Sequence, residues 1–364
     1  MNILISEFTG LGNSIMIVPL IYNLNKKLPT AKITLIGDNR YGGLDIFRYD
    51  QKIYEIINYK NLNFFQKIKF FFFINKYNFL LVSAESGINI ILFFLLNFFF
   101  KNKIIITENL FKSYLYKIKL INRIIFFVSL KIRSIFKKEI NIIKLDKDLH
   151  EVQANLLLGK FISREIEIRE TGYGNFNYYY NRTILKKLNL KENEYVCIQP
   201  LCSSGLKTTK NWGLDKFQTL IKNNFFDNFK IVFLGDKIEK EIVGNFFKTE
   251  KIVNLLGLTN LDDLINLIKF TKFTICHDSG ILHLSELLNK KSISIWGPTY
   301  LKKSGPISKN GSYVYNSQSC SPCWGTFGDQ ISDIEAYERC ENNFACMKKI
   351  TPEHVIQIIK KNIK

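Results

Sequence analysis

Acidic residues are scarce in this chain of 364 residues. Its 32 aspartates and glutamates compare with 51 lysines and arginines, so the formal net charge is +19. A positive charge suits nucleic acid, anionic lipid or a phosphorylated substrate as a partner. The alternative is compositional, because an AT-rich genome would enrich lysine, asparagine, isoleucine and phenylalanine without selection for binding. No segment resembles a nucleic-acid recognition motif, so we expect no nucleic-acid partner.

Apolar runs long enough to cross a bilayer are also lacking. The run at residues 88–100 (INIILFFLLNFFF) is shorter than the roughly 20 residues that a spanning helix needs. It indicates a buried helix or, as an alternative, contact with a membrane surface. Residues 1–10 lack the basic start of a secretory signal, and the seven cysteines are expected to be either buried, like Cys197 and Cys276 in apolar strands, or clustered late in the chain. We therefore expect a cytoplasmic protein, with peripheral contact at the inner face of the cytoplasmic membrane as an option.

The first half of the chain alternates short apolar runs with helical patterns, which predicts an α/β domain. Strands are expected at residues 2–8, 32–37, 77–83 and 103–107. A glycine-rich loop is expected at 9–14, and helices at 15–28 and 150–161. Residues 111–147 read as basic and helical. No period is visible in 163–180, so the first domain is predicted to span residues 1–175.

The second half, residues 176–350, repeats the alternation. Strands are expected at residues 195–199, 230–234, 251–254, 273–276 and 292–296, with helices between them. Such alternation predicts a doubly wound parallel sheet in each domain. A final helix is expected at residues 351–364, where Thr351 and Pro352 form a helix start.

The stretch at residues 273–299 contains the strongest candidate for a binding loop. An apolar strand ends in Asp278-Ser279-Gly280, and a helix with His283 in its first turn follows. A helix N-terminus presents free N–H groups and suits a phosphate. A second apolar strand then ends in Gly297-Pro298-Thr299. The unit is therefore βαβ, with an anion-binding loop at a strand end.

These residues resemble a known signature. The pattern Asp-Ser-Gly-x-x-His followed by Gly-Pro-Thr is similar to that of the glycosyltransferase family containing the bacterial ADP-heptose:lipopolysaccharide heptosyltransferases. The segment Lys210-Asn211-Trp212 resembles that family's K-x-W segment, and the loop at 9–14 resembles its acceptor-side loop. The resemblance implies a GT-B fold, with two Rossmann-like domains facing a cleft and a C-terminal helix that can cross back to the first. The first domain would hold the acceptor and the second the nucleotide sugar.

The resemblance also implies a donor site without a catalytic metal or other cofactor. Lysine and hydroxyl groups would stabilise the negative charge that develops on a nucleoside diphosphate leaving group. The segment Gly235-Asp236-x-x-Glu239 resembles the region at the ribose, without deciding which acid binds it. The expected donor-binding residues are Ser203, Ser204, Thr208, Thr209, Lys210, Asp236, Glu239, Asp278, Ser279, Gly280 and His283.

The general base departs from the family pattern. The family places an aspartate after the glycine of the first loop, whereas this chain has Gly12-Asn13, and asparagine cannot accept a proton. Glu7 and Glu85, each near a predicted strand end, could replace it; otherwise the activity is altered or lost. The expected catalytic residues are Glu7, Asn13, Glu85, Lys210 and Asp278.

Four late cysteines form the last motif. Cys320, Cys323, Cys340 and Cys346 are two pairs of thiols, the usual count for a structural metal, although reduced cysteines or disulfides are the alternative. The segment 320–346 also resembles the cysteine finger of autotransporter heptosyltransferases, which glycosylate protein and hold iron in that finger. Structural zinc or iron is therefore expected.

The sequence thus favours an inverting glycosyltransferase that moves a sugar, expected to be heptose from ADP-heptose, onto the lipopolysaccharide core. The rivals are a protein O-heptosyltransferase and a catalytically inactive homologue that binds nucleotide sugar or glycan. A nucleotide-binding oxidoreductase is a further alternative, based on Gly10-x-Gly12.

Overall fold

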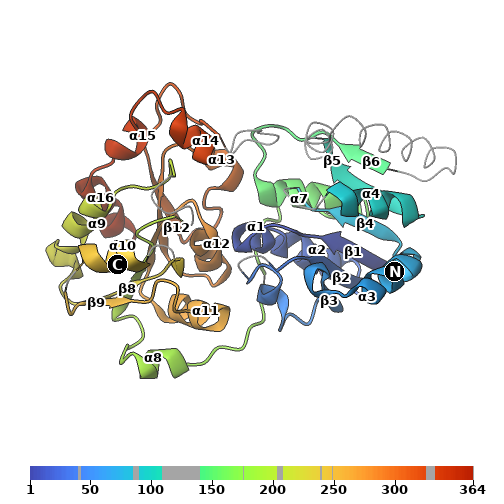
Figure 1. Cartoon of the computed structure of the whole chain (residues 1–364), viewed down its shortest axis with the longest axis horizontal. Coiled ribbons are helices and arrows are strands. Elements are labelled where there is room, and N and C mark those ends of the chain that lie inside the picture. Colours follow the sequence, from blue (N-terminus) through green and yellow to red (C-terminus); the bar gives the residue numbers. More distant parts are fainter. Residues whose placement is uncertain are drawn as a thin grey trace. The chain divides into compact units, whose positions relative to one another are not determined.

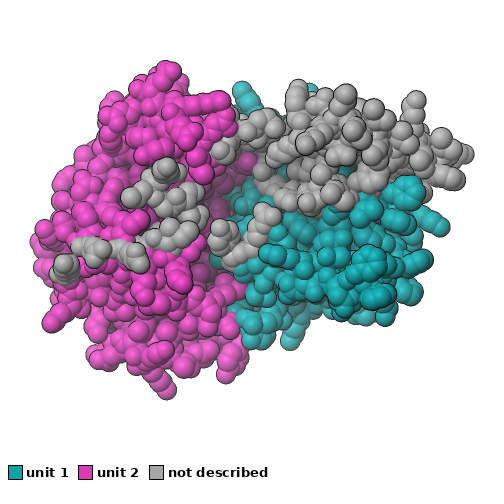
Figure 2. Space-filling view, viewed as in Figure 1, with its two compact units in different colours: residues 1–178 teal, residues 179–364 magenta. Residues whose placement is uncertain are grey.

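The computed structural model describes residues 1–39, 42–84, 90–108, 140–174, 176–202, 208–237, 240–247, 249–324 and 333–363 (Figure 1). The chain divides into two compact units, unit 1 (Met1–Tyr178) and unit 2 (Tyr179–Lys364), which Figure 2 colours separately. The expected boundary between residues 175 and 176 falls close to the point where unit 1 ends.

The described residues of unit 1 form a six-stranded parallel sheet in the order β3-β2-β1-β4-β5-β6. Its strands are β1 (Asn2–Ser6), β2 (Lys32–Gly37), β3 (Glu55–Asn58), β4 (Phe79–Val82), β5 (Lys103–Thr107) and β6 (Ile140–Ile143). The helices are α1 (Leu11–Met16), α2 (Val18–Lys27), α3 (Phe64–Phe73), α4 (Ile90–Phe99) and α7 (Glu151–Lys160), with 3₁₀ turns η2 (Asp45–Phe47), η3 (Tyr59–Asn61) and η4 (Ile74–Lys76). The strand order reverses between β1 and β4, which makes this the switch point of the sheet.

The described residues of unit 2 repeat this topology, with the order β12-β11-β10-β7-β8-β9 and parallel pairing throughout. The strands are β7 (Tyr195–Ile198), β8 (Lys230–Phe233), β9 (Ile252–Asn254), β10 (Thr274–His277), β11 (Ser292–Trp296) and β12 (Gly311–Tyr315). The helices are α8 (Thr183–Lys187), α9 (Leu214–Ile221), α10 (Lys240–Phe246), α11 (Leu261–Phe270), α12 (Gly280–Leu287), α13 (Leu301–Ser304), α14 (Asp333–Glu338), α15 (Ala345–Lys348) and α16 (Pro352–Asn362), with the 3₁₀ turn η5 (Asn224–Phe226). Here the switch point lies between β7 and β10.

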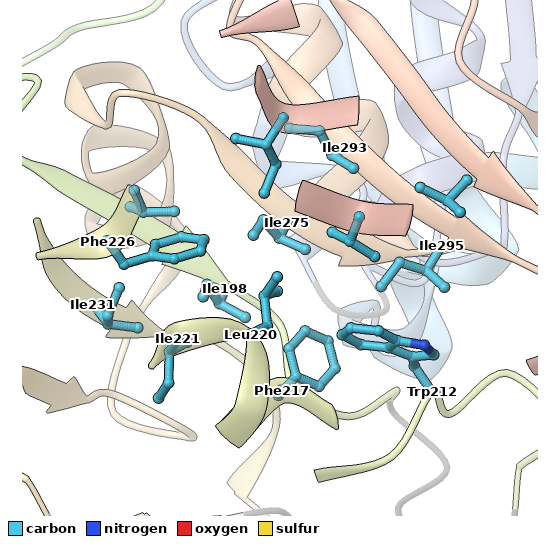
Figure 3. Packing of buried hydrophobic residues seen from close by; sticks show 14 of the residues in the cluster. Ile198, Trp212, Phe217, Leu220, Ile221, Phe226, Ile231, Ile275, Ile293 and Ile295 are labelled. Atoms are coloured by element: carbon cyan, nitrogen blue, oxygen red, sulfur yellow. The ribbon is translucent and has the colours of Figure 1, made fainter. Parts of the chain in front are cut away.

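The core of unit 2 explains why these strands form where they do. Isoleucines from β7, β8, β10 and β11 meet Phe217 and Leu220 of α9, Phe226 of η5 and Trp212 (Figure 3). Strands β7, β10 and β11 are buried along their whole length. A parallel strand covered on both faces requires a continuous run of such residues, and β-branched side chains fit the pleated surface.

Helix starts in unit 2 follow local capping chemistry. The Asn260 side chain accepts from the Asp263 N–H, which caps α11. The Thr351 side chain accepts from the His354 N–H at the start of α16, and Pro352 occupies the first position, where no N–H is needed. These ends therefore lie where the residue types predict them.

Two expectations about the fold are wrong. Residues 11–14, expected to lie in a glycine-rich loop, begin helix α1. Residues 140–143, expected to be helical, form the edge strand β6, whereas residues 109–139 of the same segment lie outside the described residues. The C-terminal helix α16 belongs to unit 2, where it packs against α9, β11 and β12. Its buried Val355, Ile356 and Ile359 join the core of that unit, which holds it there.

The apolar run at residues 88–100 contains α4, as expected for a buried helix. Leu92, Phe93 and Leu96 of α4 are buried in the core of unit 1. Within the described ranges, no helix combines the length and apolar character needed to cross a membrane.

Candidate functional site

The candidate site lies at the switch point of the unit 2 sheet. Strand β7 is followed by the loop that leads to Lys210, and β10 is followed by Asp278 and Ser279. The carboxyl ends of these adjacent strands are where ligands bind in open α/β sheets. The two loops that the sequence predicted separately therefore meet at one place.

Lys210 joins the two loops through Asp278. Its Nζ lies 3.1 Å from the Asp278 Oδ2 atom and donates to the Asp278 backbone oxygen, also at 3.1 Å. Both side chains are largely buried, at 19% and 13% exposed. Lys210 Nζ also lies 4.6 Å from the centre of the Trp324 ring, a cation–π contact. The ammonium is thus held in one position.

Electrostatics keeps this pair ionised. Burial alone would lower the pKa of Lys210, but the charge and hydrogen bond of Asp278, together with Cys202 and Asp333, outweigh it and the pKa is raised. Burial alone would raise the pKa of Asp278, yet the charge of Lys210, followed by that of His283, holds it below its usual range. The site therefore carries a fixed positive and a fixed negative group across the physiological pH range.

A second link across the switch point involves Ser279. Its Oγ donates to the Gln199 Oε1 atom, at the end of β7, at 2.5 Å. Ser279 is the N-cap residue of α12 with an extended backbone, and Gly280 is the first residue of that helix. The predicted placement of this loop at a helix start is confirmed.

Thr208 and Thr209 are buried and bind Asp333, at the start of α14. The Thr208 hydroxyl donates to the Asp333 carboxylate, and the Thr209 N–H and hydroxyl donate to its Oδ1 atom at 3.1 and 2.9 Å. Trp324 Nε1 donates to the Thr209 hydroxyl at 2.9 Å. Sequence reasoning missed Asp333 and Trp324, because nothing near them in the chain indicates a contact with the lysine loop.

His277 is a further residue that the sequence did not single out. It is fully buried at the end of β10, where its Nε2 atom accepts from the Trp212 N–H at 3.2 Å. Burial, with a smaller contribution from the charge of Lys210, lowers the pKa of His277 to about 3. A neutral histidine therefore anchors the segment after Lys210 to β10.

Of the remaining donor-site candidates, His283 and Asp236 are described by the structure and the other three are not. His283 is buried in α12, close enough to Asp278 to influence its pKa. Asp236 follows β8 and accepts from the Lys237 N–H at 2.5 Å. Ser203, Ser204 and Glu239 lie outside the described residues.

The catalytic candidates of the first half belong to unit 1. Glu7 is buried beyond β1 and accepts from the hydroxyls of Thr9 and Ser83 and from the Thr9 N–H. Asn13 lies in α1 and is partly exposed. Glu85 lies outside the described residues. Glu7 is thus held in a hydrogen-bonded setting at the switch point between β1 and β4.

The four late cysteines are neighbours. Burial, followed by the thiols of Cys320, Cys346 and Cys340, raises the pKa of Cys323 to about 12. Asn342 Nδ2 lies 3.2 Å from the Cys320 sulfur, and the Phe344 N–H donates to the Cys340 sulfur at 3.3 Å. Over the part of the chain that the structure describes, no three His, Cys, Asp or Glu side chains are arranged to hold a metal ion. The Cys323 N–H donates to the Pro298 oxygen at 2.8 Å, which attaches this segment to the loop after β11.

Comparisons with known proteins agree with this architecture. Residues 146–327, half of the chain, match the model of glycosyltransferase family 9 (heptosyltransferase). A lipooligosaccharide heptosyltransferase 2 from Campylobacter jejuni is 26% identical over 160 residues, which are 42% of this chain and 47% of that protein. The match thus spans about half the length of that relative.

Solved structures show the fold over a longer range. The Escherichia coli ADP-heptose lps heptosyltransferase II superposes with a TM-score of 0.67 at 16% identity, over 100% of this chain and 98% of that one. The iron-containing dodecameric glycosyltransferase TibC from enterotoxigenic E. coli gives a TM-score of 0.55 at 12% identity, over 99% and 75% of the chains. With two Rossmann-like sheets, the chain has the GT-B fold. The chain belongs to glycosyltransferase family 9.

Proposed function

We propose that this protein is an inverting glycosyltransferase that moves heptose from ADP-heptose onto the core of lipopolysaccharide. The observation that carries the proposal is the buried pair Lys210–Asp278 at the switch point of unit 2. Membership of family 9 supports the reaction class. The donor is the one named for the E. coli heptosyltransferase II. The acceptor class is the one suggested by the name of the C. jejuni relative.

Lys210 would stabilise the diphosphate as the glycosidic bond breaks. An ammonium has three N–H donors, and Asp278 receives two of them. Among the partners that the described residues provide, this leaves one donor for a phosphate oxygen. The charge is positioned before the donor arrives, so little reorganisation is needed when negative charge develops on the leaving ADP. The N-terminus of α12, with Ser279 and Gly280, would receive the second phosphate.

The general base is proposed to be a glutamate of unit 1. Asn13 cannot remove a proton from the acceptor hydroxyl. Glu7 can, although its hydrogen bonds from Thr9 and Ser83 must then give way to the acceptor. Glu85 is the second candidate. Glu7→Gln and Glu85→Gln should separate them, because removal of the base lowers the rate by about 10²–10⁴-fold, whereas the other variant retains donor binding and turnover.

A protein hydroxyl is the alternative acceptor. The segment that contains Cys320, Cys323, Cys340 and Cys346 favours this alternative, because it resembles the cysteine finger of heptosyltransferases that act on protein. Transfer to a protein acceptor, without transfer to the lipopolysaccharide core, would decide for this alternative.

We also propose that Cys320, Cys323, Cys340 and Cys346 bind structural zinc or iron. Four sulfurs fit either metal in kind, and hydrogen bonds such as that from the Phe344 N–H to the Cys340 sulfur stabilise thiolates. The metal would order the segment that carries Trp324 and Asp333 and would take no part in the transfer. Purified protein should contain one zinc or iron per chain, and a Cys323→Ser/Cys346→Ser variant should contain none. Metal-free wild-type protein that is equally stable would refute this part.

The donor site is tested by thermal stabilisation. A ligand that binds the native state at 100 times its Kd stabilises by about 2.7 kcal/mol. ADP and ADP-heptose should raise the melting temperature, and Lys210→Ala and Asp278→Ala should remove the shift. Lys191→Ala is the matched control, because this lysine of unit 2 is 76% exposed. A shift with UDP- or GDP-sugars alone would change the donor, and a shift with NAD alone would favour the oxidoreductase alternative.

Turnover separates an enzyme from an inactive homologue. Release of ADP that depends on a lipopolysaccharide core acceptor is the expected result. Donor binding without turnover on any acceptor would indicate an inactive, glycan-binding homologue, in which Asn13 stands in place of the general base. We place the reaction in the cytoplasm, where the acceptor would be reached at the membrane surface.

A further inference from the structure

Helix α3 in unit 1 has an apolar side that none of the described residues of its unit covers. None of its residues is buried, and Phe65 and Phe72 are 78% and 79% exposed. With one apolar face packed, a surface helix of a globular protein normally turns charged or polar residues outward. The exposed apolar side chains on and beside this helix are called the aromatic patch here: Phe64, Phe65, Ile68, Phe72, Phe73, Phe98 and Phe99.

The opposite face of α3 is the one that packs against the rest of unit 1. Phe70 and Phe71 pack against the core of unit 1, and the Phe70 ring lies 6.3 Å from that of Tyr59. The outer phenylalanines are therefore additional to the core. Leaving several phenylalanines in water has a cost of roughly 1.5–3 kcal/mol each relative to burial. A patch of this kind marks an interaction site.

The aromatic patch is continuous across two helices. The Phe71 ring lies 5.4 Å from that of Phe99, at the end of α4, and Phe98 and Phe99 contact each other. Asn75 fixes the two ends, because its side chain donates to the Phe99 oxygen and accepts from the Lys101 N–H. Both helices belong to unit 1 (Figure 1). The patch is thus held by the fold and needs no rearrangement to be presented.

The sequence around the patch is basic, although Glu55 lies 3.5 Å from Lys76 and offsets its charge. Between Glu55 and Glu85 the sequence contains Lys60, Lys67, Lys69 and Lys76 and no acidic residue, and Lys101 and Lys103 follow α4. Lys60, Lys69 and Lys101 are exposed, and Lys67 Nζ lies over the Tyr59 ring at 5.1 Å. Phenylalanines that enter the acyl region, beside lysines at headgroup level, are the features of a helix that lies on an anionic membrane.

We propose that the aromatic patch docks unit 1 on an anionic phospholipid surface. A second copy of the chain fits less well, since a symmetric contact would set the same lysines against each other. The patch is separate from the basic segment 111–147, of which residues 111–139 lie outside the described part. The inference does not rest on the proposed transfer, because lipid binding requires neither donor nor acceptor. If both hold, the acceptor-side unit would meet a lipid-linked substrate at the bilayer surface.

The test is sedimentation of the full chain with vesicles. We expect partition into vesicles containing phosphatidylglycerol, weaker binding to pure phosphatidylcholine, and a decrease with salt. Phe65→Ser/Phe72→Ser should lower the partition coefficient at least about tenfold. Phe161→Ser is the matched control, because Phe161 is 51% exposed in the same unit outside the patch. All three positions are solvent-exposed, so unchanged melting temperatures should show that the variants fold.

The contribution of the lysines beside the aromatic patch is tested separately. One lysine near an anionic surface contributes about 1 kcal/mol, or roughly a fivefold change in partition. Lys67→Gln/Lys69→Gln should therefore weaken binding to the anionic vesicles about 25-fold, whereas Lys147→Gln/Lys160→Gln, exposed elsewhere in unit 1, should have a smaller effect. Wild-type binding by the phenylalanine variant, or equal binding to neutral vesicles, would overturn the proposal. So would a dimer in light scattering that Phe65→Ser/Phe72→Ser converts to a monomer, since the patch would then join two copies. Donor binding and turnover without vesicles are unaffected by these outcomes, so the two proposals can fail independently.

Discussion

The ammonium of Lys210 lies 3.1 Å from a carboxylate oxygen of Asp278, and the two residues come from loops that follow neighbouring strands at the switch point. Largely buried ion pairs contribute little net stability, because desolvation offsets most of the attraction. Under the proposed function, the pair instead places a positive charge where it would stabilise the leaving diphosphate. The Trp324 ring and Asp278 together restrict the lysine to one position.

Lys210→Ala should therefore reduce activity far more than it reduces folding. Loss of one preorganised group that stabilises developing charge typically lowers kcat by about 10²–10³-fold. We expect a loss of this size in kcat/KM for the donor, measured by ADP release, with Lys191→Ala unchanged. A variant that changes only the KM of the acceptor would show that Lys210 does not act on the diphosphate.

Asp333→Ala should loosen the loop that carries Lys210. The buried hydroxyls of Thr208 and Thr209 would lose a shared carboxylate, at a cost of about 1–3 kcal/mol in the free energy of unfolding. Donor affinity should fall as well, measured by calorimetry with ADP, because the loop would no longer be preorganised. Glu338→Ala, exposed at the end of the same helix, is the control. Equal ADP affinity in both variants would confine Asp333 to a structural role.

The contrast between these residues shows what sequence can predict of the site. Lys210 and Asp278 stand in short local patterns beside apolar strands, and parallel strand topology brings such loop residues together. Asp333 reaches Thr209 across 124 positions of the chain, from a segment without periodicity. Its contact depends on how the segment after β12 folds back, and no local pattern encodes that path.

The strands also differ in how well the sequence predicts them. The central strands β1, β7, β10 and β11 were predicted because burial on both faces requires continuous apolar runs. Of the described edge strands, β9 was predicted, whereas β3, β6 and β12 were missed or read as helix, because they are partly exposed and their sequences are mixed. For these three segments, pairing with the neighbouring strand decides the structure.

Gly257→Ala should destabilise unit 2 through its backbone. Gly257 has φ +64°, and an added Cβ would lie 2.4 Å from the Lys237 Cα atom, in the loop that carries Asp236. Left-handed backbone costs alanine about 1 kcal/mol, and overpacking adds roughly 1–3 kcal/mol. Urea unfolding should therefore show a loss of about 2–4 kcal/mol. Gly172→Ala, where the new Cβ would meet nothing within 4 Å, should be near neutral; equal losses would contradict the steric account.

His277 should make stability depend on pH in the mildly acidic range. Its folded pKa of about 3 lies well below the usual value of 6.5, since burial and the charge of Lys210 disfavour the imidazolium. Between these values the unfolded chain binds a proton that the folded chain does not, so stability rises with pH. This stabilisation is complete above pH 6.5 and is lost progressively as the pH falls. At about 1.4 kcal/mol per pH unit, the group alone should lower the free energy of unfolding by roughly 2 kcal/mol between pH 6.5 and pH 5.

His277→Gln isolates that contribution. Glutamine can still accept a hydrogen bond from the Trp212 N–H but does not titrate. Urea unfolding at pH 7.5 reports the cost of the altered packing alone, because the wild-type histidine is then neutral in both the folded and the unfolded chain. On acidification from pH 7.5 to pH 5, the free energy of unfolding of the variant should therefore fall by about 2 kcal/mol less than that of the wild type. Parallel pH profiles for the two proteins would mean that His277 becomes protonated in the folded state, and that the hydrogen bond from Trp212 to its ring is broken in mild acid.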